Sequence, residues 1–216
     1  MVAKIKTAII TFPGTNCERD LHYGLTQVLG ADATYIRHDQ PVDLRQYQVI
    51  FLPGGSSYGD RGAPGQLAAK TPIIDSLRQA DARGQKIVGI CNGFQILTQA
   101  GLLPGKLLQN PSGKFICKTV PVLFAPSNTR INLPIAHLSG NYQCTPQEAE
   151  NMQVVLTYQE DINGSINKIA GISNKAGNIL GLMPHPERAL ESILGNTDGL
   201  KFFEYILQQF SKEKGN

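Results

Sequence analysis

The sequence lacks the features that mark membrane proteins and nucleic-acid-binding proteins. No apolar run in its 216 residues approaches the roughly 20 residues that a bilayer-spanning helix needs. The net charge is only +3, and the basic residues are scattered, with no arginine-rich stripe of the kind that binds nucleic acid. We therefore expect neither a membrane nor a nucleic-acid partner.

Cysteine is also scarce, and its spacing does not fit the usual disulfide and zinc motifs. The four cysteines are Cys17, Cys91, Cys117 and Cys144, and no two of them form a C-x-x-C pair. Residues 1–14 contain basic residues and a short apolar stretch, but no small-residue cleavage site of a signal peptide. We therefore expect free thiols, no metal and a cytoplasmic location.

What is present is the composition of a globular chain. Hydrophobic residues make up 41% of the sequence, which is neither membrane-like nor disordered. The chain contains no internal repeat, no low-complexity segment and no convincing linker. Its length suits one hydrophobic core, so residues 1–216 are predicted to form a single domain.

The first half alternates between short apolar runs and amphipathic stretches. The predicted strands are residues 5–11, 33–37, 49–52 and 86–90, and the predicted helices are residues 18–29, 73–83 and 92–100. Thr15 and Glu18 have the spacing of a capping box at the start of the first helix. Apolar strands that alternate with helices are typical of an α/β fold, in which helices cover both faces of an open, mostly parallel twisted sheet.

The second half changes character, because shorter strands follow one another there. The predicted strands are residues 115–123, 131–135, 154–158, 169–173 and 179–183, and the last helix spans about residues 197–210. Residues 174–178 have the composition of a hairpin loop between the last two strands. We expect these strands to add a small mixed or antiparallel β layer.

The most informative segment is Gly89-Ile90-Cys91-Asn92-Gly93, which joins a predicted buried strand to a helix. This is the Gly-x-nucleophile-x-Gly pattern of hydrolases with a doubly wound sheet. The turn is so tight that the nucleophile sits at strained dihedral angles and its flanking residues must be glycine. Cys91 is therefore expected to project above the carboxyl ends of the strands, at a helix start that favours its thiolate.

A thiolate that attacks an amide also needs a proton donor for the leaving ammonia. Of the four histidines, His185 is the best candidate, because Pro184 and Pro186 hold its segment out of helix. In an extended segment, residues two apart point the same way, so Glu187 is predicted to orient His185 rather than to form a surface ion pair. His137 follows a predicted strand and is a candidate for lining the substrate pocket.

Attack on an amide places negative charge on its oxygen, and backbone N–H groups are the usual stabilisers. The residue after the nucleophile, Asn92, supplies one such group. Gly55, in a glycine loop that ends a predicted strand, offers a second. The sequence alone leaves open whether this loop is a plain tight turn. It lacks the Lys-Ser/Thr pair that a phosphate-binding P-loop requires.

Together these segments resemble the class I glutamine amidotransferases, which have a flavodoxin-like sheet. More narrowly, they resemble the glutaminase subunits of phosphoribosylformylglycinamidine synthases. The resemblance spans nearly the whole chain and rests on FPGTNCERD at 12–20, PGGSSYGD at 53–60, GICNGFQ at 89–95 and MPHPERA at 183–189. It implies that Gln95 helps to hold glutamine and that a glutamyl thioester forms on Cys91.

The resemblance also implies partners. Ammonia would pass within a docked complex to a large synthase subunit of purine synthesis, and a small third protein would bridge the two. No nucleotide site is recognisable in this sequence, so no cofactor is expected on this chain, and ATP and Mg²⁺ are expected on the partner subunit.

Two stretches depart from the family pattern. Residues 136–140 read Ala-His-Leu-Ser-Gly where the family has Ala-His-Gly-Glu-Gly, and residues 61–64 also differ, so no role is carried over to either stretch. Two alternatives stay open. One is a glutaminase for a different synthase or a cysteine hydrolase on the same scaffold, and the other is a catalytically inactive domain that only docks to a partner.

Overall fold

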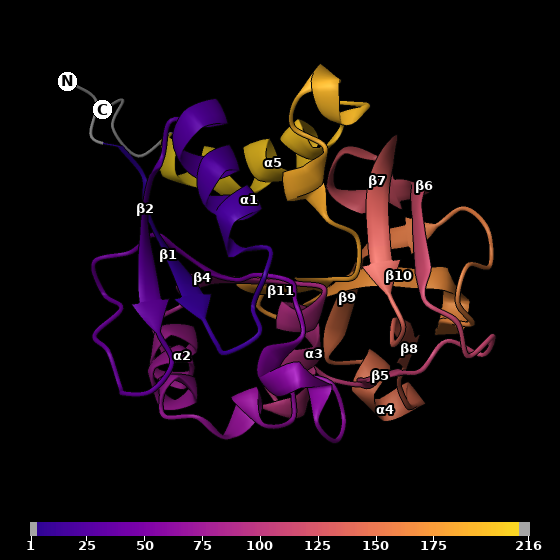
Figure 1. The fold of residues 1–216 in the computed structure, drawn as a ribbon, viewed down its shortest axis with the longest axis horizontal. Helices are drawn as coiled ribbons and strands as arrows, with labels where there is room; N and C mark the ends of the chain where they lie inside the picture. The colour runs from indigo at the N-terminus through magenta and orange to yellow at the C-terminus, as the bar shows by residue number, and fades with distance from the viewer. Residues whose placement is uncertain (1–3, 212–216) are drawn as a thin grey trace.

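The computed structural model describes residues 4–211 and contains a large mixed β-sheet with helices on both of its faces (Figure 1). The strands are β1 (Lys6–Thr11), β2 (Asp32–Arg37), β3 (Val49–Leu52), β4 (Lys86–Ile90), β5 (Lys106–Leu108), β6 (Ile116–Phe124), β7 (Thr129–His137), β8 (Asn141–Gln143), β9 (Met152–Tyr158), β10 (Ile169–Asn174) and β11 (Ile179–Leu182). The α-helices are α1 (Glu18–Tyr23), α2 (Ile73–Ala82), α3 (Asn92–Gln99), α4 (Pro146–Ala149) and α5 (Gly199–Ser211).

The sheet has a parallel half and an antiparallel half, in the order β2-β1-β3-β4-β11-β10-β9-β6-β7. Strands β2, β1, β3, β4 and β11 pair in parallel, and the remaining neighbours pair antiparallel. Strand β11 joins the halves, because it is parallel to β4 and antiparallel to β10. The antiparallel strands thus extend the same sheet, and β5 and β8 form a separate two-stranded sheet.

Helices cover the sheet because their apolar sides are buried against it. In Figure 1, α1 and α5 lie on one face of the sheet, and α2 and α3 lie on the other. Helix α5 buries Phe202, Phe203 and Ile206, and α3 is buried along nearly all of its length. Every residue of β3 and β4 is buried, as expected for parallel strands covered on both sides. The predicted α/β fold is therefore confirmed.

The predicted capping box at Thr15 and Glu18 is wrong. The Thr15 hydroxyl accepts a hydrogen bond from the Phe12 amide at 3.0 Å, within the turn that ends β1. Residue Cys17 is the N-cap of α1, and its side chain makes no capping bond. A capping box of the same spacing instead begins α4, where Thr145 and Glu148 each accept from the other's amide.

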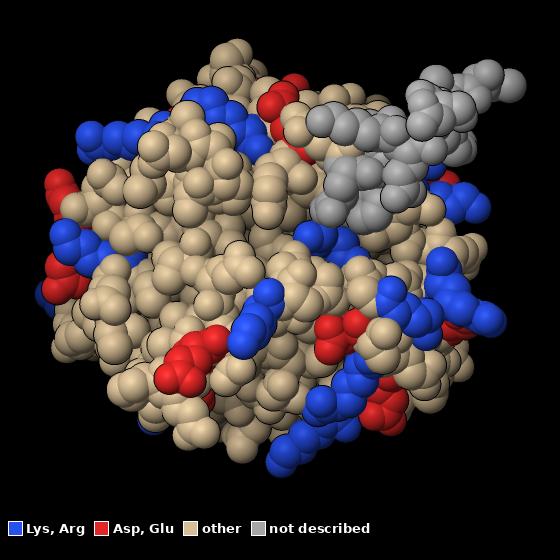
Figure 2. Space-filling model, turned by 180° about the vertical axis from the view of Figure 1, so that it is seen from behind, with Lys and Arg blue, Asp and Glu red and all other residues tan. Residues whose placement is uncertain are grey.

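Within residues 4–211, no helix is long and apolar enough to cross a membrane. On the face drawn in Figure 2, Lys and Arg side chains are interspersed with Asp and Glu side chains and with large uncharged areas. The net positive charge is therefore spread out on this face.

Candidate active site

The turn between β4 and α3 holds Cys91 in a strained conformation, with φ 51° and ψ −104°. Such angles cost a non-glycine residue about 1–3 kcal/mol. The flanking residues must be glycine because any side chain there would clash with the backbone. A Cβ on Gly93 would lie 1.9 Å from the Leu52 carbonyl oxygen. A Cβ on Gly89 would likewise lie 2.6 Å from the Gly93 carbonyl group. The tight elbow predicted from the sequence is present.

Three loops meet above the carboxyl ends of the parallel strands, where open α/β sheets bind ligands. They are residues 53–60 after β3, the elbow after β4, and residues 183–188 after β11. The last loop is attached to the antiparallel half, because the His185 amide donates to the Pro134 carbonyl at 2.8 Å. These loops, the segment after β1 and the end of β7 line a cavity of about 540 Å³, into which Cys91 and His185 face.

His185, which lines this cavity, forms a buried pair with Glu187. The imidazole Nδ1 lies 2.6 Å from the Glu187 Oε1 atom, and the two residues are only 1% and 3% exposed. Burial by itself lowers the pKa of His185, but the nearby Glu187 carboxylate, together with Cys91 and Cys17, raises it well above its usual value. The other ring nitrogen, Nε2, has no hydrogen-bond partner within the described chain. It is therefore free to exchange a proton with a bound molecule.

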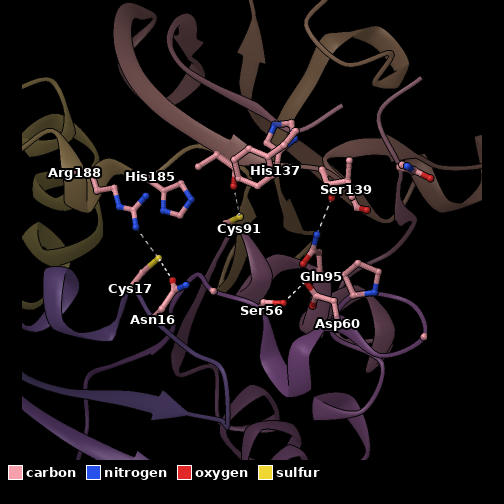
Figure 3. A pocket seen from close by; sticks show the side chains of 17 residues that line it. Asn16, Cys17, Ser56, Asp60, Cys91, Gln95, His137, Ser139, His185 and Arg188 are labelled. Carbon is pink, nitrogen blue, oxygen red and sulfur yellow. Dashed lines mark hydrogen bonds between the residues drawn. The ribbon is translucent and has the colours of Figure 1, made fainter. Parts of the chain in front are cut away.

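Gly54 shows how closely the cysteine and the histidine approach. A Cβ placed on Gly54 would lie 2.7 Å from Cε1 of His185, 3.4 Å from Cβ of Cys91 and 3.0 Å from Sγ of Cys17. Figure 3 shows the sulfur of Cys91 and the ring of His185 facing the same cavity. The structure thus brings Cys91 together with the His185–Glu187 pair, which lies far from it in the sequence.

The backbone amides predicted to stabilise an oxyanion are those of Asn92 and Gly55. Asn92 is the first residue of α3, where an N–H has no partner inside the helix. Thr15 and Gly55 form an antiparallel β-bridge, in which the Asn16 amide donates to the Gly54 carbonyl and the Ser56 amide donates to the Gly14 carbonyl. The Gly55 N–H is not used in this bridge and points away from it. Gly55 has φ 143°, and a Cβ there would lie 2.7 Å from the Asn16 nitrogen. Only glycine fits this position.

Gln95 lines the cavity, but its amide is already engaged. Its Oε1 accepts from Nδ2 of Asn92 at 2.8 Å, and its Nε2 donates to the Ser139 carbonyl at 2.7 Å. The Asn92 Oδ1 also accepts from the Ser57 amide at 3.1 Å. These bonds tie the loop after β3, helix α3 and the segment after β7 into one rigid wall.

His137 ends β7 and also lines the cavity. It is only 3% exposed, and neither ring nitrogen has a partner in the described part of the chain. Burial, reinforced by the neighbouring His185, lowers its pKa to about 4, so the ring is neutral at physiological pH. Outside the cavity, His22 stacks on Tyr35, and His38 lies beside Phe12.

The cavity lining includes side chains to which the sequence analysis gave no role in the site, among them Cys17, Asp60 and Arg188. The Arg188 guanidinium donates to the Cys17 sulfur at 3.1 Å and pairs with Asp20 at 3.2 Å. Figure 3 places Cys17 and Asp60 on opposite sides of Cys91. All three residues lie inside the motifs that carry the family resemblance, and that position is the signal that could have found them.

Three buried groups at this site lie close enough to share a metal ion. Ligand atoms of Cys17, His185 and Glu187 lie within 4.8 Å of one another. However, Nδ1 of His185 is already bonded to Glu187. A cation that used this nitrogen would therefore have to break the pair.

Comparison with known proteins places this site in a family. A model of the CobB/CobQ-like glutamine amidotransferase domain matches residues 4–201. The chain is 44% identical to the phosphoribosylformylglycinamidine synthase subunit PurQ of Lacticaseibacillus casei, over 95% of this chain and 96% of that protein. The PurQ subunit of Lacticaseibacillus paracasei matches with the same identity and coverage.

Solved structures agree with the sequence comparison. A chain in the structure of PurLQS from Thermotoga maritima has a TM-score of 0.89 and 43% identity, and the match covers 96% of this chain and 99% of that one. A glutamine amidotransferase from Thermotoga maritima has a TM-score of 0.59 and 14% identity, with coverage of 97% and 86%. At this identity the second match shows the fold alone.

Proposed function

The chain belongs to the CobB/CobQ-like glutamine amidotransferase family, and we propose that it is the glutaminase subunit of a phosphoribosylformylglycinamidine synthase, in purine biosynthesis. The two PurQ relatives, each 44% identical over nearly the whole chain, support this assignment. The observation that carries the chemistry is the meeting of strained Cys91 with the buried His185–Glu187 pair in one cavity.

The reaction begins when the Cys91 sulfur, as the thiolate, attacks the side-chain amide carbon of glutamine. The carbonyl oxygen becomes negatively charged in the tetrahedral intermediate. The N–H groups of Gly55 and Asn92 donate hydrogen bonds to it and stabilise the charge. Both amides belong to segments that glycine contacts hold rigid, so they need little reorganisation during the reaction.

His185 moves the protons. Its raised pKa keeps the ring protonated at neutral pH, and the unpartnered Nε2 donates its proton to the leaving nitrogen. The C–N bond breaks, ammonia leaves and a glutamyl thioester remains on Cys91. His185 is then neutral and takes a proton from the water that hydrolyses the thioester to glutamate. Glu187 holds Nδ1 throughout and stabilises the imidazolium.

Delivery of ammonia requires a partner. In water at neutral pH ammonia is mostly protonated and loses its nucleophilicity, so transfer within a docked complex keeps it reactive. The chain therefore acts as one subunit of a multi-subunit synthase. In this proposal a large subunit binds ATP and Mg²⁺ and consumes the ammonia, and a small third protein bridges the two.

The test compares glutamine with ammonia as nitrogen source in the assembled complex. Cys91→Ala should abolish glutamine-dependent synthesis and leave ammonia-dependent synthesis intact. The matched control is Cys117→Ala, which removes an exposed thiol outside the cavity and should keep both activities. If Cys91→Ala removes both activities together, the residue is structural and the proposed mechanism is wrong.

The same assay separates the two alternatives. A catalytically inactive docking domain would support ammonia-dependent synthesis only, even in the unmutated form. It would also form no covalent adduct on Cys91 with a glutamine-like diazo ketone in mass spectrometry of the complex. A glutaminase for a different synthase would form the adduct but transfer no ammonia to this synthase.

A further inference from the structure

We propose that Asp60 binds the α-ammonium group of glutamine and thereby selects an amino-acid amide over other amides. The proposal rests on the glutaminase function above. It deepens that function by assigning the residue that recognises the part of the substrate farthest from the reacting bond.

The charge balance of the cavity is the first argument. Among the described residues that line it, Asp60 carries the only carboxylate. Glutamine enters as a zwitterion, and an ammonium group that loses water without meeting a negative partner pays a large desolvation penalty. Leu138 and Ser139, at the end of β7, contribute no charge to the same cavity.

Two hydrogen bonds hold the Asp60 carboxylate in place, and it forms no ion pair with a Lys or Arg side chain of the described residues. Its Oδ2 accepts from the Ser56 hydroxyl at 2.6 Å, and its Oδ1 accepts a weaker bond from Nδ2 of Asn92 at 3.3 Å. A carboxylate has about four acceptor sites, so two remain available. No Lys or Arg side chain of the described chain lies within 4.0 Å of it.

The loop geometry places this charge near the nucleophile. Asn92, which follows Cys91 directly, contacts both Asp60 and Gln95. In glutamine, three carbon–carbon bonds separate the amide carbon from the α-carbon, so the ammonium group lies only a few bonds from the reacting amide. Tyr58 and Asp60 have φ values of 56° and 48°. Such strain in non-glycine residues is typical of ligand-binding positions.

The experiment uses two substrates and the assembled complex. One substrate is glutamine, and the other is glutaric acid monoamide, which keeps the amide, the chain and the carboxylate but lacks the α-amino group. Asp60→Asn keeps the shape and removes the charge. We expect kcat/KM for glutamine to fall about 30-fold or more, as for other desolvated charge pairs. We expect the value for the monoamide to change less than about 3-fold, because this substrate makes no ammonium contact.

The kcat/KM values for glutamine and for the monoamide are measured on the same sample of each variant. A fraction of unfolded protein lowers both values equally, so their ratio does not depend on it. Asp60→Glu, which restores the charge, should recover part of the preference for glutamine. Asp32→Asn removes the same charge from an exposed strand residue and should leave both values unchanged.

Equal losses for both substrates, or no loss for either, would overturn the proposal and make Asp60 a structural residue of the loop. That outcome would leave the glutaminase function standing. If the unmutated complex used ammonia but not glutamine, the proposed function itself would fail.

Discussion

In one wall of the cavity the backbone conformation matters most, and in the other the ionisable side chains do. One, the backbone wall, consists of residues 53–60 and 89–95, where glycines and positive φ angles set the shape. The other, the imidazole wall, consists of residues 134–139 and 183–188, where buried ionisable side chains set the chemistry. Changes at the glycines of the backbone wall should therefore appear first as lost stability. Damage to the imidazole wall should appear as lost activity with a changed pH profile.

The largest effect is expected in the imidazole wall, from Glu187→Gln. This change removes the charge that opposes burial, so the pKa of His185 falls. We expect glutamine-dependent kcat/KM to drop about 10³- to 10⁴-fold, as in other triads that lose their carboxylate. His185 must be protonated to release ammonia, and the Glu187 carboxylate raises the pKa at which it loses that proton. The alkaline limb of the pH profile should therefore move to lower pH in the variant.

The measurement is kcat/KM against pH in the assembled complex, with ammonia-dependent synthesis as the internal reference. Glu160→Gln, at an exposed position, is the matched control and should change neither limb. An unchanged alkaline limb in Glu187→Gln would mean that another group, not His185, delivers the proton.

A smaller effect, and one on stability, is expected in the backbone wall from Gly93→Ala. The added methyl group would lie 1.9 Å from the backbone oxygen of Leu52, and a strand in the middle of the sheet cannot move away. We expect the free energy of unfolding to fall by about 3 kcal/mol or more. Denaturant unfolding of the purified chain measures it.

Gly84→Ala is the control for that change. Gly84 has φ 72°, but a Cβ there meets nothing within 4 Å, so only the backbone strain of about 1–2 kcal/mol remains. Equal losses in the two variants would show that the contact with Leu52 contributes nothing beyond conformational strain.

The same contrast explains what the sequence could predict. The elbow is a local feature, because five consecutive residues at the end of a buried strand determine its geometry. The first four strands, α2 and α3 were predicted to within a residue or two, because each is a continuous apolar or amphipathic run. The first predicted helix, residues 18–29, is α-helical only over Glu18–Tyr23 and continues as a π-helix over Gly24–Val28. Strands β5 and β8 and helix α4 were missed, because three or four residues are too few to show a period.

The rest of the cavity depends on contacts between distant segments. The T-x-x-E spacing occurs at both Thr15 and Thr145, yet only the second forms a capping box. A turn after β1 engages the hydroxyl of the first, and no local pattern reveals this. Cys17, Asp60 and Arg188 likewise line one cavity only because the segments after β1, β3 and β11 end at the same edge of the sheet. Sequence spacing alone cannot show such a meeting.

The smallest effect should come from Cys17→Ser, which tests whether a thiol in the cavity matters by its position or by its chemistry. Cys17 donates to Oδ1 of Asn16 and accepts from Arg188, and a serine hydroxyl can do both. Its backbone, with φ −98°, lacks the strained elbow of Cys91. We expect glutamine-dependent kcat/KM to change less than about 5-fold, equivalent to about 1 kcal/mol, and the diazo ketone adduct to stay on Cys91. If Cys17→Ser lost as much activity as Cys91→Ala, both sulfurs would take part in the reaction, and strained geometry would not be what distinguishes the nucleophile.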